Sequence, residues 1–205
     1  MKLFGPESPL VKALAFIGNM FLLNVLFIVC SLPVVTFGAS ASALYSVAFK
    51  ITGGESTYIA KDFFRAFRKN FLRATGEWLI ILLVAFGLWY GTEIMENIPH
   101  DFPFVITVAY IIIALLLVIE FSWVFAIEAK FENSLGNQLK NAVILAVTNP
   151  LRAVVAAVLS VFPVELLMFA PYYALLTSVF WFLFGFAGIA LINSLMFRKV
   201  FDKYR

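Results

Sequence analysis

Few side chains in this sequence combine an ionisable group with a strongly apolar neighbourhood, and Glu120 is the clearest of them. It stands in an apolar run over residues 103–127, about two helical turns from the end of that run. A charge near the centre of a bilayer costs at least about 2.5–3.5 kcal/mol, so this carboxylate should face protein or water. Glu120 is then either a proton- or substrate-binding group paired with Arg73 or Arg152, or a structural acid that is ion-paired or keeps its proton.

Other polar side chains in apolar runs suit structural roles better than chemical ones. Asn24 and Asn193 stand within such runs, and we expect each to make hydrogen bonds between helices, typically worth less than about 1–2 kcal/mol. Glu77 and Glu165 stand near the ends of runs, where an acidic side chain can reach the membrane–water interface.

The residue types that catalysis and metal binding require are scarce. His100 is the only histidine and Cys30 the only cysteine, whereas a zinc site needs several Cys, His or carboxylate ligands together. A nucleophile–base pair would have to use His100, which stands in a polar segment away from Cys30 and most serines. No glycine loop that could bind a phosphate is present. We therefore predict no enzyme activity, no cofactor and no metal site.

The composition is that of an integral membrane protein. Apolar residues make up 63% of the 205 residues and charged residues 13%, whereas soluble domains average about half and about a quarter. A soluble fold of this size cannot hide so much apolar surface. The net charge is only +3 and the basic residues flank apolar runs, which points to lipid rather than nucleic acid. We expect one all-helical domain over residues 1–205.

About 20 mainly apolar residues are needed to span a bilayer, and the chain offers about six such runs. The first begins at Pro9 with Ser8 as N-cap, and Pro33 and Gly38 separate it from a short second run. That second run either spans fully or re-enters, which is tolerated only where protein or water covers the backbone. The predicted segments are Pro9–Leu32, Gly38–Thr52, Trp78–Met95, Pro103–Ile127, Pro150–Met168 and Tyr173–Phe197.

Two polar intervals between these runs have amphipathic patterns. In Glu55–Thr75, apolar residues recur every three or four positions with basic residues between them. This pattern predicts a helix in the headgroup region, whose basic face over Lys61–Arg73 would meet anionic lipid. The second interval is Glu128–Thr148, and Asn149 and Pro150 after it suit the N-cap and first position of a new helix.

The basic residues fix a predicted orientation. Six segments place both termini and both polar intervals on one side, and that side then receives all 15 Lys and Arg residues. The opposite side receives Pro33–Phe37, Glu96–Asp101 and Phe169–Tyr172, which contain none. Because cytoplasmic loops are rich in Lys and Arg, we predict that both termini and both intervals lie in the cytoplasm.

Part of the chain matches itself after a shift of 79 residues. Asn70 then falls on Asn149, and Leu72–Ala74 on Leu151–Ala153. Internal repeats are common in transporters, but helix starts also share composition, so both explanations stay open.

Several blocks of the chain resemble the YesL-type family of uncharacterised bacterial integral membrane proteins. The resemblance covers most of the chain, although Phe131 stands where the family commonly has tyrosine. The blocks are Ser31–Ser40 with Ala43-Leu44-Tyr45 and Lys50, Asp62–Phe71 with Ala74-Thr75, Phe131-Glu132-Asn133, Leu139–Ala142, Gly185 and Asn193.

What the resemblance implies is a protein of the bacterial plasma membrane, often encoded near carbohydrate uptake and degradation systems. One hypothesis is an accessory or regulatory protein that contacts another membrane complex, such as a sugar importer. The alternative is a small secondary transporter that uses Glu120 as its coupling group, in which a homo-oligomer could supply the pathway. A purely structural or lipid-interacting role is a third option.

Overall fold

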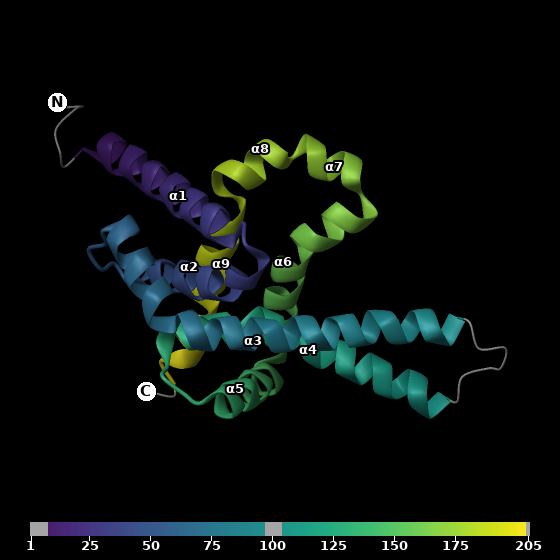
Figure 1. The fold of residues 1–205 in the computed structure, drawn as a ribbon. Coiled ribbons are helices and arrows are strands. Elements are labelled where there is room, and N and C mark those ends of the chain that lie inside the picture. The colour runs from purple at the N-terminus through teal and green to yellow at the C-terminus, as the bar shows by residue number, and fades with distance from the viewer. Residues whose placement is uncertain (1–7, 97–103, 204–205) are drawn as a thin grey trace.

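The computed structural model describes residues 8–96 and 104–203, and the regular elements in these ranges are helices (Figure 1). Six helical segments are long and apolar enough to cross a membrane. The predicted all-helical architecture with about six membrane segments is thereby confirmed. Most of the predicted loop 96–101, with His100, lies outside the described residues, as do Lys2 and Arg205.

The helices follow the apolar runs and are joined by short connections. Figure 1 shows α3 and α4 side by side, with the C-terminal end of α3 and the N-terminal end of α4 projecting beyond the other helices. The elements are α1 (Pro9–Ser31), a 3-10 turn (Val34–Thr36), α2 (Phe37–Thr52), α3 (Ile59–Glu96), α4 (Phe104–Lys130), α5 (Leu135–Thr148), α6 (Pro150–Phe169), α7 (Pro171–Leu176), α8 (Ser178–Phe180), a π-helical turn (Trp181–Gly185) and α9 (Phe186–Phe201).

The start and end of α1 have the predicted local causes. The Ser8 hydroxyl oxygen accepts a hydrogen bond from the Val11 N–H at 3.3 Å, so Ser8 is the N-cap as expected. At the other end, Pro33 cannot continue the helix. The Thr36 hydroxyl donates to the carbonyl oxygen of Cys30 at 2.6 Å, which satisfies one of the carbonyls that the helix end leaves free.

Helix α2 lies at the centre of the fold, packed against α1, α3, α4 and α9. Every residue from Gly38 to Tyr45 is buried, and the small side chains in this run allow close helix packing, as predicted. The 16 residues of α2 span roughly 24 Å, less than the ~30 Å hydrocarbon core. The surrounding helices therefore cover a segment that is shorter than a full span.

Close approach of α2 to α3 requires glycine at position 38. A methyl group there would overlap the carbonyl oxygen of Ala74 and lie 2.8 Å from the Cβ atom of Trp78. We expect Gly38→Ala to force the helices apart and to lower the free energy of unfolding by about 1–3 kcal/mol, as overpacking does.

Thermal unfolding in detergent tests this prediction, with Gly87→Ala on α3 as the control. A methyl group on Gly87 would meet no neighbouring atom within 4 Å, and alanine favours a helix over glycine by up to about 1 kcal/mol. Equal melting temperatures for the two variants would contradict the close-packing explanation.

Helix α3 corrects the prediction of a separate amphipathic interval over Glu55–Thr75. Its 38 residues form one continuous helix, about 57 Å long at the usual rise per residue. The expected break before Trp78 is absent because this stretch contains no proline, and Gly76 alone does not end a helix.

The apolar face of the first half of α3 packs against the rest of the protein. Ile59 and Phe63 do not face lipid but are buried in the protein core. Phe64 is exposed on the opposite side, among Lys61 and Arg68. The first half of α3 is therefore a packed element of the fold with a basic outer face.

The last predicted segment, Tyr173–Phe197, is interrupted rather than continuous. The chain turns at Pro171 as expected, but it then forms the short helices α7 and α8 and the π-helical turn before α9 begins. Gly185 ends that turn, and a methyl group there would overlap the Trp181 ring. The ring therefore occupies the space that any larger residue would need.

The connection at Asn149 has a different cause from the predicted one. Its side chain makes no N-cap hydrogen bond to α6. The amide nitrogen instead donates to the carbonyl oxygen of Leu145 at 3.1 Å, near the end of α5. The 79-residue shift therefore aligns a helix junction at Asn149 with Asn70, which lies inside the continuous α3.

Candidate functional site

Helix ends from several parts of the chain meet at one place, which we call the charged end. The C-terminal ends of α2, α4 and α9 and the N-terminal end of α3 come together there. Arg198 Nη1 donates to the carbonyl oxygen of Thr52 at 2.6 Å, and Lys50 Nζ lies 2.9 Å from Asp62 Oδ1. The charged end comprises Lys50, Asp62, Arg65, Lys69, Arg73, Glu128, Lys130, Glu132 and Arg198.

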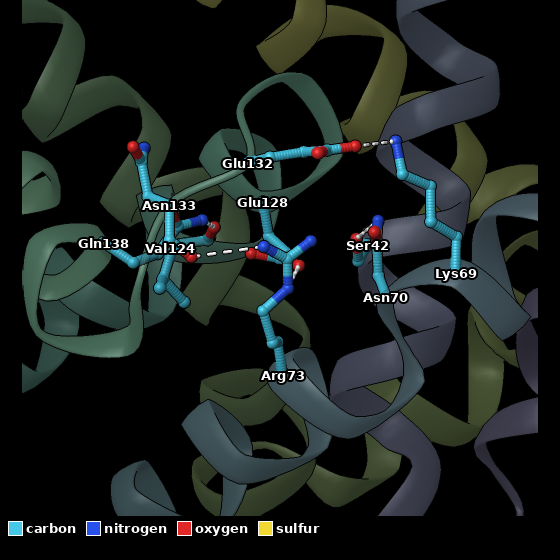
Figure 2. Close-up of polar contacts among 9 residues, drawn as sticks. All are labelled: Ser42, Lys69, Asn70, Arg73, Val124, Glu128, Glu132, Asn133 and Gln138. Atoms are coloured by element: carbon cyan, nitrogen blue, oxygen red, sulfur yellow. Dashed lines mark hydrogen bonds and ion pairs between the residues drawn. The ribbon is translucent and has the colours of Figure 1, made fainter.

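The central contact of the charged end is an ion pair between Arg73 on α3 and Glu128 on α4 (Figure 2). Arg73 Nε lies 3.1 Å from Glu128 Oε1, and the Glu128 side chain has no exposed surface. Arg73 Nη1 also donates to the carbonyl oxygen of Asn133 at 3.2 Å. One guanidinium group thus joins α3, α4 and the connection to α5.

Neutral side chains fix the same helices around this pair. Asn70 Nδ2 donates to the hydroxyl oxygen of Ser42 at 2.7 Å, which joins α3 to α2. Gln138 Nε2 donates to the carbonyl oxygen of Val124 at 3.3 Å, which joins α5 to α4. Both amides are buried, so these contacts are shielded from water and set the positions of the helices (Figure 2).

Ion pairs nearer the surface complete the charged end. Lys69 Nζ binds Glu132, and this hydrogen bond from the ammonium group lowers the pKa of Glu132. Asp62 accepts from the N–H of Tyr58 at 3.0 Å, so it caps the start of α3 while it pairs with Lys50. Surface pairs contribute little to stability, so their main effect is on the charge pattern of this face.

A polar pocket of about 180 Å³ opens between α2, α3 and the end of α4. Both acidic and basic side chains line it, and its wall includes Glu128 of the buried ion pair and the amide of Asn70. The pocket therefore borders the Arg73–Glu128 pair, while the Glu128 side chain itself stays covered.

The predicted pairing of Glu120 is wrong. Arg73 pairs with Glu128, and Arg152 donates to the amide oxygen of Asn149 at 3.2 Å. Glu120 makes no ion pair among the described residues, and its Oε2 atom is buried without a hydrogen-bond partner. Glu120 and Glu128 are eight residues apart on one helix, roughly 12 Å along its axis. Arg73 lies beside Glu128.

The prediction that Glu77 lies at the membrane–water interface also needs correction, because the side chain is buried in the protein. It has an exposed fraction of 0%, and neither carboxylate oxygen has a hydrogen-bond partner. Arg73 on its own helix and Glu120 and Glu128 on α4 act on it electrostatically. Because α3 is continuous, Asn70, Arg73 and Glu77 lie on one stripe of the helix at three- and four-residue spacings. This spacing is the sequence signal that could have identified Glu77 as a buried residue.

The two predicted intramembrane asparagines make the expected interhelical hydrogen bonds. Asn193 Nδ2 on α9 donates to the hydroxyl oxygens of Tyr45 at 3.0 Å and Ser160 at 3.3 Å. Asn24 on α1 is hydrogen-bonded to the interrupted segment before α9. These contacts are structural, and neither asparagine lies at the charged end.

A second pocket, of about 110 Å³, opens between helices of the bundle and is almost entirely apolar. Its walls come from α1, α2, α4, α6 and α9, and Tyr45 and Ser160 are its polar members. In the part of the chain that the structure describes, no three His, Cys, Asp or Glu side chains are grouped so that they could hold a metal ion.

Comparison with known proteins gives one family match. Searches of the curated proteins and of the solved structures each found no match. Residues 20–91 match a family model described as "Protein of unknown function, DUF624". This stretch contains about half of α1, all of α2 and most of α3, and so includes Asn70, Arg73 and Glu77. The match is consistent with the YesL-type resemblance, because both relate the chain to proteins of uncharacterised function.

Proposed function

We propose that this chain is an accessory or regulatory protein of a bacterial plasma membrane, linked to carbohydrate uptake, with both termini in the cytoplasm. In this role the charged end faces the cytoplasm and contacts a membrane transporter complex. The spanning helices hold that surface at the membrane rather than forming a passage for the sugar.

The contrast between the two pockets carries this proposal. A sugar presents many hydroxyl groups, and a passage for it needs polar partners along its length. The pocket between the helices of the bundle is apolar except for Tyr45 and Ser160, whereas the polar and charged groups gather in the pocket at the charged end. The arrangement therefore suits recognition at the membrane surface better than passage of a sugar.

Two further points support the proposal. The link to carbohydrate uptake follows from the YesL-type resemblance, whose members are often encoded near such systems. The outer face of α3 exposes Lys61, Arg65 and Arg68 beside Phe64. Basic groups beside an aromatic side chain fit anionic lipid headgroups, so this face would keep the charged end close to the membrane.

Affinity purification from the native host tests the accessory role. We expect a tagged chain, expressed at its native level and extracted in mild detergent, to bring down the permease subunits of a sugar importer. Lys130→Glu should reduce this recovery at least about tenfold, because reversing a charge at an interface adds like-charge repulsion. Lys140→Glu is the control, since Lys140 is exposed on α5 and is not part of the pocket.

A small secondary transporter is the second candidate, and the buried, unpaired oxygens of Glu77 and Glu120 favour it. Recovery of the chain alone, as monomer or homo-oligomer, from cells that contain the importer would contradict the accessory role. Sugar uptake into proteoliposomes that contain only this chain, and its loss in Glu120→Gln, would establish the transporter instead.

A further inference from the structure

Glu77 is an acidic side chain that lies inside the fold without a hydrogen-bond partner. Its side chain is completely buried, and neither of its carboxylate oxygens has a hydrogen-bond donor. An ionised carboxylate without donors or a paired cation is strongly disfavoured away from water. Some positive charge must therefore be supplied to Glu77, either by a basic side chain or by a proton.

Arg73, the basic side chain near Glu77, already contacts other groups. Arg73 is the cation that acts on Glu77, but its guanidinium lies 3.1 Å from Glu128 and donates to the carbonyl oxygen of Asn133. Glu120 and Glu128 both add negative charge to the surroundings of Glu77. The cluster therefore contains one arginine and up to three carboxylates, so its acidic groups outnumber its basic ones.

Other helices packed against α3 do not supply the missing charge. On α2, Lys50 pairs with Asp62, and the Tyr45 hydroxyl accepts from Asn193 on α9. The remaining titratable groups on these packed helices do not act on Glu77. They are Lys12 and Cys30 on α1, Tyr110 and Lys130 on α4, and Lys61, Arg65, Arg68, Lys69, Tyr90 and Glu93 on α3 itself.

The polar pocket supplies a route for protons. Glu128 forms part of its wall, and so does Asn70, which is only 3% exposed. The amide oxygen of Asn70 is buried and has no hydrogen-bond donor. The carboxylate oxygens of Glu128 are themselves buried, so a proton from the pocket meets them only when the side chains of this wall move.

We propose that Glu77 is a proton-binding site inside the helix bundle, reached from the charged pocket by way of Glu128. When the side chains of the pocket wall move apart, a hydronium ion in the pocket gives its proton to a Glu128 oxygen and leaves as water. The proton then moves to a Glu77 oxygen, and Glu128 is again the anion that pairs with Arg73. Neither step depends on the accessory role, since both follow from the placement of the two carboxylates and the pocket.

Infrared difference spectroscopy of the full chain in lipid nanodiscs tests the proton directly. A protonated carboxylic acid has a carbonyl stretch that an ionised carboxylate lacks. At neutral pH we expect such a band in the native chain, loss of its Glu77 component in Glu77→Gln, and retention of that component in shifted form in Glu77→Asp. Glu165→Gln, which changes an exposed glutamate on α6, should leave the band unchanged.

The same band tests the route. Ser46 lines the pocket, so Ser46→Phe should fill it and slow deuterium exchange of the Glu77 band at least about a hundredfold, the lower end of the effect of a positioned proton-transfer group. Ser134→Phe, at an exposed position outside the pocket, is the control. Exchange that is equally fast in both variants would overturn the route through the pocket.

Two results would overturn the proton site itself. One is the absence of a protonated-acid band in the native chain at neutral pH, which needs no variant. The other is a band that remains unchanged in a folded Glu77→Gln protein, since the proton would then reside on another carboxylate. Neither result bears on whether importer subunits co-purify, so failure here is distinguishable from failure of the accessory role.

Discussion

Replacing Arg73 with leucine is expected to lower the free energy of unfolding by about 3 kcal/mol, the lower end for breaking a buried ion pair. Glu128 would keep a fully buried carboxylate without its cation, and the carbonyl oxygen of Asn133 would lose its donor. The lower end applies because the Arg73 side chain is 32% exposed, so water can reach part of the site. Denaturant unfolding in detergent micelles measures the change.

Matched variants separate the ion pair from a general loss of charge. Arg68→Leu removes a cation from an exposed position on the same helix, and we expect it to have little effect. The double variant Arg73→Leu/Glu128→Leu should recover most of the lost stability, because an apolar pair of similar volume replaces both charges. Equal destabilisation by Arg73→Leu and Arg68→Leu would show that the pair is not the cause.

Replacing Asn24 with leucine is expected to cost about 2–3 kcal/mol, because a single buried group left without its partner costs ~1–3 kcal/mol. The Asn24 amide nitrogen donates to the carbonyl oxygens of Trp181 at 2.9 Å and Phe182 at 2.7 Å. Its amide oxygen accepts from the N–H of Ala187 at 2.9 Å. These groups lie in or beside the π-helical turn Trp181–Gly185, where the regular α-helical pattern of hydrogen bonds is interrupted.

Hydrogen exchange locates this effect as well as measuring it. In Asn24→Leu, amide protons around Trp181–Ala187 should exchange faster than in the native chain, while those of α2 should change less. Asn19→Leu is the control on the same helix, since Asn19 has no hydrogen bond to the interrupted segment. Similar exchange around the π-helical turn in the two variants would mean that Asn24 does not hold that turn.

The sequence alone was enough to predict most of the spanning segments. Transfer of an apolar run from water to lipid depends mainly on the residues of that run, so Pro9–Ser31 and Phe104–Lys130 could be placed closely. Proline and the residues beside it also act locally. The turn after Ser31 and the junction before Pro150 were therefore predictable.

The boundaries that failed depended on contacts with other helices. The stretch between Glu55 and Trp78 contains no proline, but it does not show whether its apolar face meets lipid or protein, because apolar side chains suit both equally. The interruption before α9 is stable because Asn24, more than 150 residues earlier, satisfies backbone groups in and beside it. No local pattern around Trp181 contains that information.

The candidate site shows the same division between local and tertiary information. Composition identified acidic and basic residues that a membrane would not tolerate unpaired, and Arg73 and Glu120 were recognised for that reason. Which acid meets Arg73 depends on the depth and rotation of α4 against α3, and these place Glu128 beside it. The burial of Glu77 follows from the same packing, with α2 and α4 against one face of α3. The free energy of transfer from water to lipid is a property of each segment, so the sequence determined the spans. Ion pairs and buried carboxylates are properties of helix pairs, so only the tertiary structure decided them.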